Sequence, residues 1–235
     1  MALHKVNTLL GVCFVYFLVC SPKAYADAST VVILDASVSM ATELDGGTRL
    51  SAAKQAVMNV LNETVQSEPS QPFGFISFYD GCWVDVMVKP RPLESVLDDI
   101  RGRVSNLQTR EFGHTPIAKS LEIAGKLLEQ DGGKIILVSD GQESCQEHRD
   151  LCELAEHLDQ INIDFEIHLV GFALSPDQED ALRCIPQATG GTFVSVNRAD
   201  DLISAVGFVA TEAGSDVQDR CYDNRGGLLH WWCEK

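Results

Sequence analysis

The chain contains 235 residues, with 18 Lys or Arg, 34 Asp or Glu and a formal net charge of −16 at pH 7. An acidic surface repels nucleic acids and anionic lipids, so we expect neither as a partner, whereas cations and basic partners are favoured. The length is sufficient for one domain with a sizeable core and a short tail.

Residues 1–26 predict a secretory signal peptide. A short basic start is followed by twelve apolar residues from Leu9 to Cys20, and Ala24-Tyr25-Ala26 forms a small-x-small cleavage site. A retained membrane anchor is the alternative, but this apolar run is shorter than the ~20 residues that span a bilayer. We therefore expect a protein exported to the periplasm or the extracellular space, with no stable membrane span after cleavage.

Strand and helix patterns alternate along the rest of the chain. Strand patterns cover 30–34, 73–79, 84–88, 134–139, 163–171 and 191–196, and amphipathic helix patterns cover 49–66, 93–104, 116–130, 147–160, 176–188 and 199–213. Several strands are apolar on both faces, as parallel strands between helices are. The link through Asp80-Gly81 predicts a hairpin, which makes 84–88 an antiparallel edge strand that Pro90 and Pro92 then stop. We predict an α/β fold: a doubly wound, mostly parallel sheet with helices on both faces.

The predicted organisation is a signal peptide over residues 1–26, one domain over residues 27–213 and a tail over residues 214–235. The tail carries the adjacent tryptophans Trp231 and Trp232. These side chains either pack against the domain or form an exposed contact site.

Three segments place oxygen-bearing side chains where predicted strands end or a helix begins. Asp35, Ser37 and Ser39 follow the first strand, Thr115 precedes a helix, and Asp140 follows the strand 134–139. Ligands of open parallel sheets bind beyond the carboxyl ends of the strands. Taken singly, each residue also fits a helix cap or a turn. Together, a carboxylate with neutral hydroxyls suits magnesium, which prefers oxygen ligands and keeps several waters, so the pattern predicts a magnesium site.

These segments resemble a known family. The run Asp35-Ala36-Ser37-Val38-Ser39, the later Thr115-Pro116-Ile117 and the Ser139-Asp140-Gly141 resemble, in this order, a von Willebrand factor type A (vWA) domain with its metal-ion-dependent adhesion site (MIDAS). The resemblance extends over roughly residues 29–213. It implies a Rossmann-like fold in which a bound metal leaves one coordination position open for an acidic side chain of a partner protein.

The resemblance also assigns roles to single residues. Hydroxyl oxygens of Ser37, Ser39 and Thr115 would bind the metal, and Asp35 and Asp140 would hold its waters or bind it directly. The expected ion is Mg²⁺, with Mn²⁺ or Ca²⁺ as substitutes. We expect His114, Gln142 and Glu143 to form the rim that contacts the partner. The chain departs from the family at Val38 and His114, where glycine, and glycine or lysine, are more usual.

The cysteines predict disulfides. Two of the eight lie in the predicted signal peptide, and the six that remain are Cys82, Cys145, Cys152, Cys184, Cys221 and Cys233. An even number in an exported chain favours disulfides, with 15 connectivities available, over a zinc site, because no Cys-x-x-Cys pair is present.

Resemblance to a bacterial exported subgroup of the family suggests how the cysteines pair. In that subgroup two cysteines clasp the loop after the fourth strand, which implies a disulfide between Cys145 and Cys152 that braces the loop carrying Asp140. We expect the remaining pairs to be Cys82 with Cys184 and Cys221 with Cys233, the last from proximity alone.

We expect an exported, metal-dependent protein-binding module of the adhesion type and not an enzyme. The sequence contains no Gly-x-Ser-x-Gly elbow and no phosphate-binding glycine loop. A metal-dependent hydrolase with His114 as the base is the first alternative. The second is a structural envelope scaffold with a degenerate site. The sequence indicates neither the partner's identity nor the oligomeric state.

Overall fold

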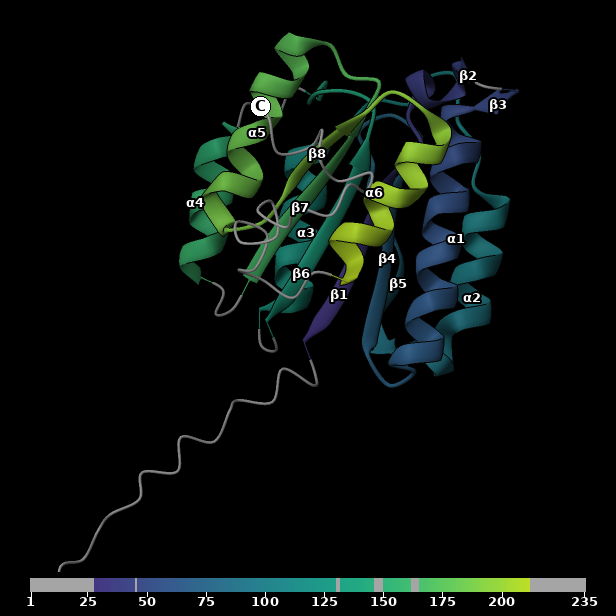
Figure 1. The fold of residues 1–235 in the computed structure, drawn as a ribbon. Coiled ribbons are helices and arrows are strands. Elements are labelled where there is room, and N and C mark those ends of the chain that lie inside the picture. Colours follow the sequence, from purple (N-terminus) through teal and green to yellow (C-terminus); the bar gives the residue numbers. More distant parts are fainter. Residues whose placement is uncertain (1–27, 45, 130–131, 146–149, 162–164, 212–235) are drawn as a thin grey trace, which may run out of the picture.

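A computed structural model describes residues 28–44, 46–129, 132–145, 150–161 and 165–211, and the predicted signal peptide and tail lie outside them. A sheet of six strands in the order β5-β4-β1-β6-β7-β8 forms the centre of the domain (Figure 1). The strands are β1 (Ser29–Asp35), β4 (Pro72–Phe78), β5 (Asp85–Pro92), β6 (Gly133–Ser139), β7 (Phe165–Phe172) and β8 (Phe193–Val196). All neighbours pair in parallel except β4 and β5, so the predicted α/β fold with one antiparallel edge strand is confirmed.

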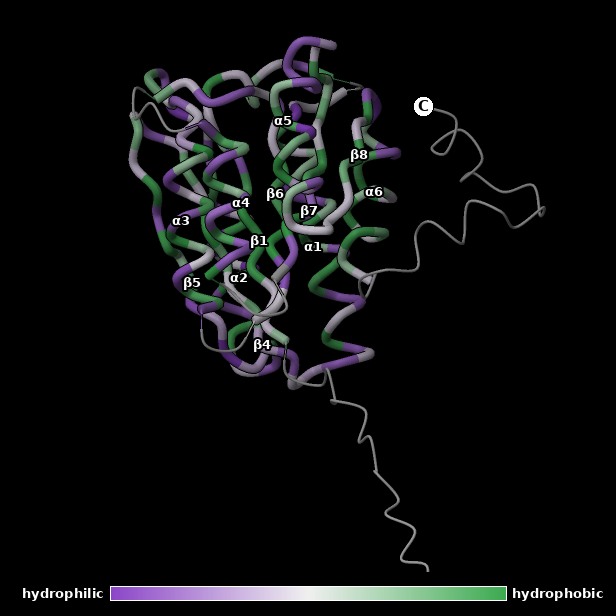
Figure 2. The backbone as a smooth tube through the Cα atoms, turned by 90° about the vertical axis from the view of Figure 1, so that its left-hand side faces the viewer, coloured by the Kyte–Doolittle hydropathy of each residue, from purple (hydrophilic) through white to green (hydrophobic). Residues whose placement is uncertain are grey.

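Six α-helices of the described residues cover the two faces of this sheet (Figure 1). They are α1 (Arg49–Ser67), α2 (Leu93–Asn106), α3 (Ile117–Leu128), α4 (Leu151–Ile161), α5 (Pro176–Thr189) and α6 (Ala199–Thr211). Helices α1, α2 and α6 share one buried cluster with Val32 and Leu34 of β1, and α3, α4 and α5 share the other with Val31 and Ile33. Successive strand residues point to opposite faces, and the residues of β1 from Val31 to Leu34 are all apolar. Both faces of this central strand are therefore apolar, and the hydropathy colouring of the chain agrees (Figure 2).

The edge strand β5 is longer than the sequence predicted. It continues through Pro90 to Pro92 and shifts register near Phe75 of β4. Proline lacks the N–H that a central strand needs, but an edge strand or a bulge tolerates it. A Cβ atom on Gly74 would lie 3.1 Å from the Pro90 ring, so this glycine gives the proline room. The expectation that Pro90 and Pro92 stop the strand after residue 88 was therefore wrong at Pro90, whereas the strand does end at Pro92.

The topology brings two carboxylates to one edge of the sheet. Strand β1 lies between β4 and β6: the chain passes from β1 to β4 on one side and later returns to β6 on the other side. Asp35 is the last residue of β1, and Asp140 follows the last residue of β6. Because β1 and β6 are parallel neighbours, both acids lie at the same carboxyl edge. At this edge the chain also forms the 3₁₀ helix η1 (Val38–Ala41) and the short hairpin of β2 (Glu43–Leu44) and β3 (Gly47–Thr48).

Two glycines test how tightly the sheet and the helices are packed. Gly133 begins β6 with a φ of +134°, and a Cβ atom there would lie 2.0 Å from the Ser29 carbonyl oxygen. Gly133→Ala should therefore lower the free energy of unfolding by ~3 kcal/mol, because both the backbone and β1 resist the side chain. Gly102→Ala on α2, where a Cβ atom meets nothing within 4 Å, should instead raise it by ~0.5–1 kcal/mol. Urea denaturation followed by circular dichroism measures both, and equal effects would contradict this packing.

Candidate metal site

Four of the five predicted metal ligands form one hydrogen-bonded cluster. Ser39 Oγ donates to Asp140 Oδ1 at 2.6 Å, and Ser37 Oγ lies 3.0 Å from Ser39 Oγ. The Ser37 amide donates to Asp35 Oδ1 at 2.7 Å. Asp35, Ser37 and Asp140 are buried and Ser39 is half-buried. Side chains about a hundred residues apart in the sequence therefore join the ends of β1 and β6.

Thr115, the fifth predicted ligand, lies beside the loop that carries Asp140. A Cβ atom built on Gly141 would lie 3.7 Å from Thr115 Oγ1. The Thr115 amide donates to Ser144 Oγ at 2.8 Å, and the Thr115 carbonyl accepts from the Ser144 amide at 3.2 Å. The loop after β6 thus binds the segment before α3 on both sides of Thr115, and this pairing holds the threonine next to Asp140.

Glu143 fixes the start of α3. Its carboxylate accepts from the amides of Ala118 at 2.8 Å and Cys145 at 2.7 Å. Helix α3 has no capping side chain at Pro116, so Glu143 supplies the negative charge that the helix N-terminus favours. The sequence analysis placed Glu143 on the partner rim, but these bonds give its carboxylate a structural role. His114 and Gln142, the other two predicted rim residues, are exposed.

Arg49 is a member of the cluster that the sequence analysis missed. Its Nη1 atom lies 2.8 Å from Asp140 Oδ2, and the Arg49 and Asp140 side chains are 20% and 0% exposed. Arg49 is the first residue of α1, where the helix dipole disfavours a cation. That unfavourable position was the one signal in the sequence that the Arg49 side chain has an acidic partner outside its own helix.

When both carboxylates are ionised, the charges of the cluster do not balance. Burial of Asp35, together with the nearby Asp140 carboxylate, raises the pKa of Asp35 from 3.8 to about 7, although hydrogen bonds from Ser139 and Ser37 act in the opposite direction. Arg49 is the single cation in contact with these two carboxylates among the described residues. A divalent cation would supply the missing positive charge, and the neutral hydroxyls would supply further oxygen ligands. The residues therefore fit a magnesium ion chemically. Among the described residues no group of three or more His, Cys, Asp or Glu is suited to a metal, so a metal at this cluster would rely on hydroxyl oxygens beside the two carboxylates.

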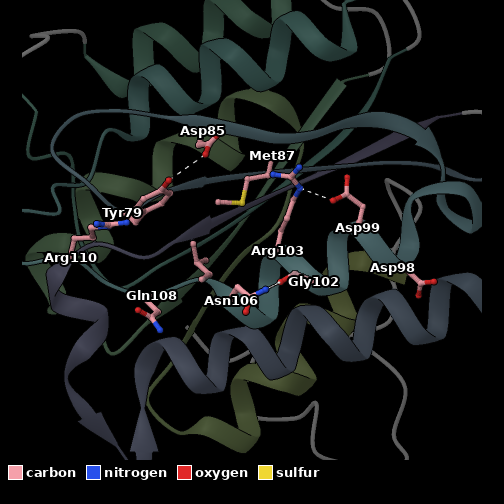
Figure 3. Close-up of a pocket in the computed structure, with 11 residues that line it drawn as sticks. Tyr79, Asp85, Met87, Asp98, Asp99, Gly102, Arg103, Asn106, Gln108 and Arg110 are labelled. Atoms are coloured by element: carbon pink, nitrogen blue, oxygen red, sulfur yellow. Dashed lines mark hydrogen bonds and ion pairs between the residues drawn. The ribbon is translucent and has the colours of Figure 1, made fainter.

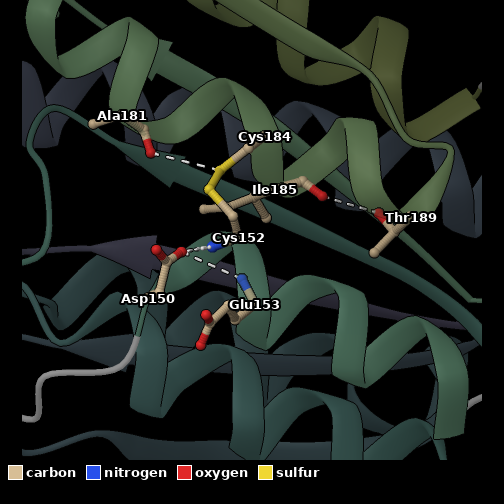
Figure 4. The surroundings of a disulfide bond; sticks show 7 residues. All are labelled: Asp150, Cys152, Glu153, Ala181, Cys184, Ile185 and Thr189. Carbon is tan, nitrogen blue, oxygen red and sulfur yellow. Dashed lines mark hydrogen bonds between the residues drawn. A yellow bond between two sulfur atoms is a disulfide. The ribbon is translucent and has the colours of Figure 1, made fainter.

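Two disulfides are present, and their pairing differs from the predicted one. Cys82 bonds to Cys145, with 5.8 Å between the Cα atoms, and Cys152 bonds to Cys184, with 5.4 Å between the Cα atoms. The predicted pairs of Cys145 with Cys152 and of Cys82 with Cys184 were therefore wrong. The loop clasp that the resemblance implied does not form, because Cys152 lies on the first turn of α4, which packs against α5 and Cys184 (Figure 4).

One of the two observed disulfides lies at the carboxyl edge of the sheet. Cys82 lies in the β4–β5 loop at the carboxyl edge, where it meets the loop that follows Asp140 and contains Cys145. This disulfide, and not the predicted one, braces the loop that carries the candidate ligand. Cys221 and Cys233 lie outside the described residues, so their pairing stays a prediction.

A cavity of about 560 Å³ lies beside α2 and the edge strand (Figure 3). Its charged side chains bind each other: the Arg103 Nε atom lies 2.8 Å from Asp99 Oδ1, and the Tyr79 hydroxyl donates to Asp85 Oδ2 at 3.4 Å. The Arg110 guanidinium lies over the Tyr79 ring, 5.6 Å from its centroid. None of the five predicted ligands lines this cavity, so it is separate from the candidate metal site.

The fold and the cluster define an open α/β domain with a candidate cation site at the carboxyl edge of its sheet. A family model described as the von Willebrand factor type A domain matches residues 30–142, from β1 to the loop after Asp140. Residues 30–142 of the chain therefore form a vWA domain.

Individual proteins agree with this assignment. The uncharacterized protein YwmD of Bacillus subtilis (strain 168) is 26% identical over 194 residues, which are 77% of this chain and 84% of that protein. The SpRpn10 VWA domain superposes with a TM-score of 0.60 at 17% identity, over 76% of this chain and 93% of that one. The pilus adhesin SpaC of Lactobacillus rhamnosus GG superposes with a TM-score of 0.62 at 16% identity, over 78% of this chain and 30% of that one. At such identities the two structures support the fold alone.

The raised pKa of Asp35 predicts a pH-dependent stability of the metal-free protein. Between pH 3.8 and about 7 the folded chain holds a proton on Asp35 that the unfolded chain has lost, so stability falls as the pH rises through this range. The full effect is on the order of 4 kcal/mol. In EDTA, Asp35→Asn should therefore gain stability relative to the wild type as the pH rises.

Urea denaturation at pH values on both sides of this range measures the difference. Asp98→Asn, at a side chain that is 100% exposed, is the matched control and should follow the wild type at every pH. An Asp35→Asn profile that runs parallel to the wild type would contradict the assigned pKa.

Proposed function

We propose that this protein is an exported binding module that uses Mg²⁺ to capture an acidic side chain of a partner protein. The observation that carries the proposal is the pair of buried carboxylates, Asp35 and Asp140, at the carboxyl edge. Arg49 is the one cation that contacts this pair among the described residues, and serine hydroxyls are hydrogen-bonded to it. A set of acids and hydroxyls that lacks one positive charge favours a hard divalent cation.

The roles of the residues follow from their chemistry. The hydroxyls of Ser37, Ser39 and Thr115, with the carboxylates of Asp35 and Asp140, would hold the ion. Bound Mg²⁺ would offer a Lewis-acidic position to a carboxylate from outside, because neutral hydroxyls leave more of its charge uncompensated than an all-carboxylate cage would. Arg49 keeps the Asp140 carboxylate in place from the side of α1. His114 and Gln142 are exposed next to Thr115 and Asp140, so they would contact the partner.

A binding role agrees better with the comparisons than catalysis does. Domains of the vWA type are typically non-enzymatic interaction modules, and the pilus adhesin SpaC is among the structural neighbours. The alternative of a metal-dependent hydrolase gains no support from the cavity beside α2, because none of the five predicted ligands lines it.

Export is part of the proposal. The two disulfides suit an oxidising compartment such as the periplasm or the extracellular space. Among the described residues no helix has the length and apolar character that a membrane span requires.

Magnesium should raise the melting temperature of the mature protein relative to the protein in EDTA. At a concentration one hundred times the dissociation constant, binding contributes ~2.7 kcal/mol, which at this chain length is a shift of roughly 5 to 10 °C. Asp35→Ala should abolish the shift, whereas the control Asp98→Asn should retain it. The absence of a shift in the wild type with Mg²⁺, Mn²⁺ and Ca²⁺ would contradict the proposal.

The two disulfides should differ in their effect on metal affinity. Replacing Cys82 and Cys145 together by alanine frees the loop after Asp140 and should weaken Mg²⁺ binding about tenfold, as loss of a group that supports a ligand does. Replacing Cys152 and Cys184 should leave the affinity unchanged, because this disulfide joins α4 to α5. Each double variant should lose ~2–4 kcal/mol of stability. Isothermal titration calorimetry separates the two effects, and equal Mg²⁺ affinities would argue against a bracing role for the first disulfide.

A further inference from the structure

Most of the large exposed apolar side chains of the described residues gather around the candidate metal site. Four are strongly exposed: Val38 (51%), Trp83 (76%), Phe112 (74%) and Ile161 (49%). Val38 begins η1, and Trp83 and Phe112 lie in loops. All three are at the carboxyl edge of the sheet, and we call them the apolar rim. Ile161 ends α4, which leads into the parallel strand β7, and therefore lies at the opposite edge. Exposed apolar groups that cluster in one place indicate an interaction site.

Each residue of the apolar rim belongs to a segment that carries a candidate ligand or is bonded to one. Val38 stands between Ser37 and Ser39. Phe112 lies three residues before Thr115. Trp83 follows Cys82, whose disulfide reaches the loop after Asp140. A partner that reaches the metal would therefore also meet the rim.

Backbone contacts hold the three segments in one arrangement. The Val38 amide donates to the Gly113 carbonyl at 3.2 Å, and the Gly81 amide donates to the Phe112 carbonyl at 2.9 Å. A Cβ atom on Gly113 would lie 2.9 Å from the Tyr79 carbonyl oxygen and 3.2 Å from the Ser37 Cα atom, so the Phe112 loop packs directly on its neighbours. Exposed side chains on a fixed backbone lose little conformational freedom when a partner binds.

One cation lies against the rim. The Lys119 ammonium lies over the Trp83 ring, 5.3 Å from its centroid. The exposed acids Asp80 and Glu111 lie in the same loops, and the Arg49 charge is paired with Asp140. The cation beside Trp83 therefore favours an acidic residue of a partner at this point of the rim.

We propose that the apolar rim binds a large apolar side chain next to the acidic residue that a partner protein presents to the metal. The inference rests on the proposed function and narrows its partner: the recognised segment carries an Asp or Glu with a neighbouring residue such as Leu, Ile or Phe. A metal binds any carboxylate, whereas contact with Trp83 and Phe112 adds binding energy only when an apolar residue stands beside that carboxylate. The rim therefore supplies the specificity for the partner.

Selection from a random-peptide phage library tests this inference. The mature full-length chain is immobilised in Mg²⁺, and bound phage are eluted with EDTA. The expected sequences contain Asp or Glu beside a large apolar residue. A selected peptide should then bind Trp83→Ala and Phe112→Ala at least ~10-fold more weakly, as at interface hot spots. Ile161→Ala is the matched control and should bind like the wild type. All three variants should retain the Mg²⁺-induced rise in melting temperature, which shows that the fold and the metal site are intact.

The possible failures are distinguishable. Acidic peptides without an apolar neighbour, or unchanged affinity in both rim variants, would overturn the inference and leave the proposed function standing. The absence of both a Mg²⁺-induced shift and EDTA-eluted peptides would overturn the two together. Dimers that Trp83→Ala abolishes would assign the rim to a second copy of the chain, and tighter peptide binding after removal of residues 214–235 would assign it to the chain's own tail. Either result would overturn the inference of a partner protein.

Discussion

The burial of two carboxylates at the ends of neighbouring parallel strands is the constraint on which the rest of the structure depends. Asp35 and Asp140 are almost fully buried because β1 and β6 are central strands with helices on both faces. Burial and the neighbouring Asp140 charge both disfavour the ionised form of Asp35, and the raised pKa of Asp35 reflects that cost. The cluster around them is the set of groups that reduces the cost: serine hydroxyls, the Ser37 amide and the Arg49 guanidinium.

The loops at this edge are organised around the same pair. The loop after Asp140 binds the start of α3 through Ser144 and Glu143, and the disulfide of Cys145 ties it to the β4–β5 loop. Thr115 is thereby fixed without a capping side chain of its own helix. A loop with this many attachments has few conformations to lose when an ion or a partner binds, which is the condition for a preorganised site. The second disulfide, between α4 and α5, stabilises the outer helical layer and takes no part in this edge (Figure 4).

Charge and apolar surface have separate roles at the carboxyl edge. The buried cluster lacks one positive charge, which favours a cation, and the apolar rim of Val38, Trp83 and Phe112 offers surface that a partner would bury. Val38 links the two, because it stands between two predicted ligands and is itself exposed. The valine that departs from the family pattern thus changes the surface beside the site while both neighbouring hydroxyls are kept. The cavity beside α2 has its own internally paired charges and contributes no ligand to the cluster (Figure 3).

The sequence by itself determined the α/β fold, the antiparallel edge strand and the five residues that converge on the carboxyl edge. It could do so because apolar periodicity fixes the strands, and parallel neighbours bring their ends together. Only the tertiary structure decided which cysteines pair, because that depends on α4 packing against α5 and on the β4–β5 loop meeting the loop after Asp140. It also decided the roles of Arg49 and Glu143, whose partners lie 91 and 25 residues away along the chain. Contacts at such separations leave little local pattern beyond the cation at the start of α1, since they arise from how helices and loops dock on the sheet.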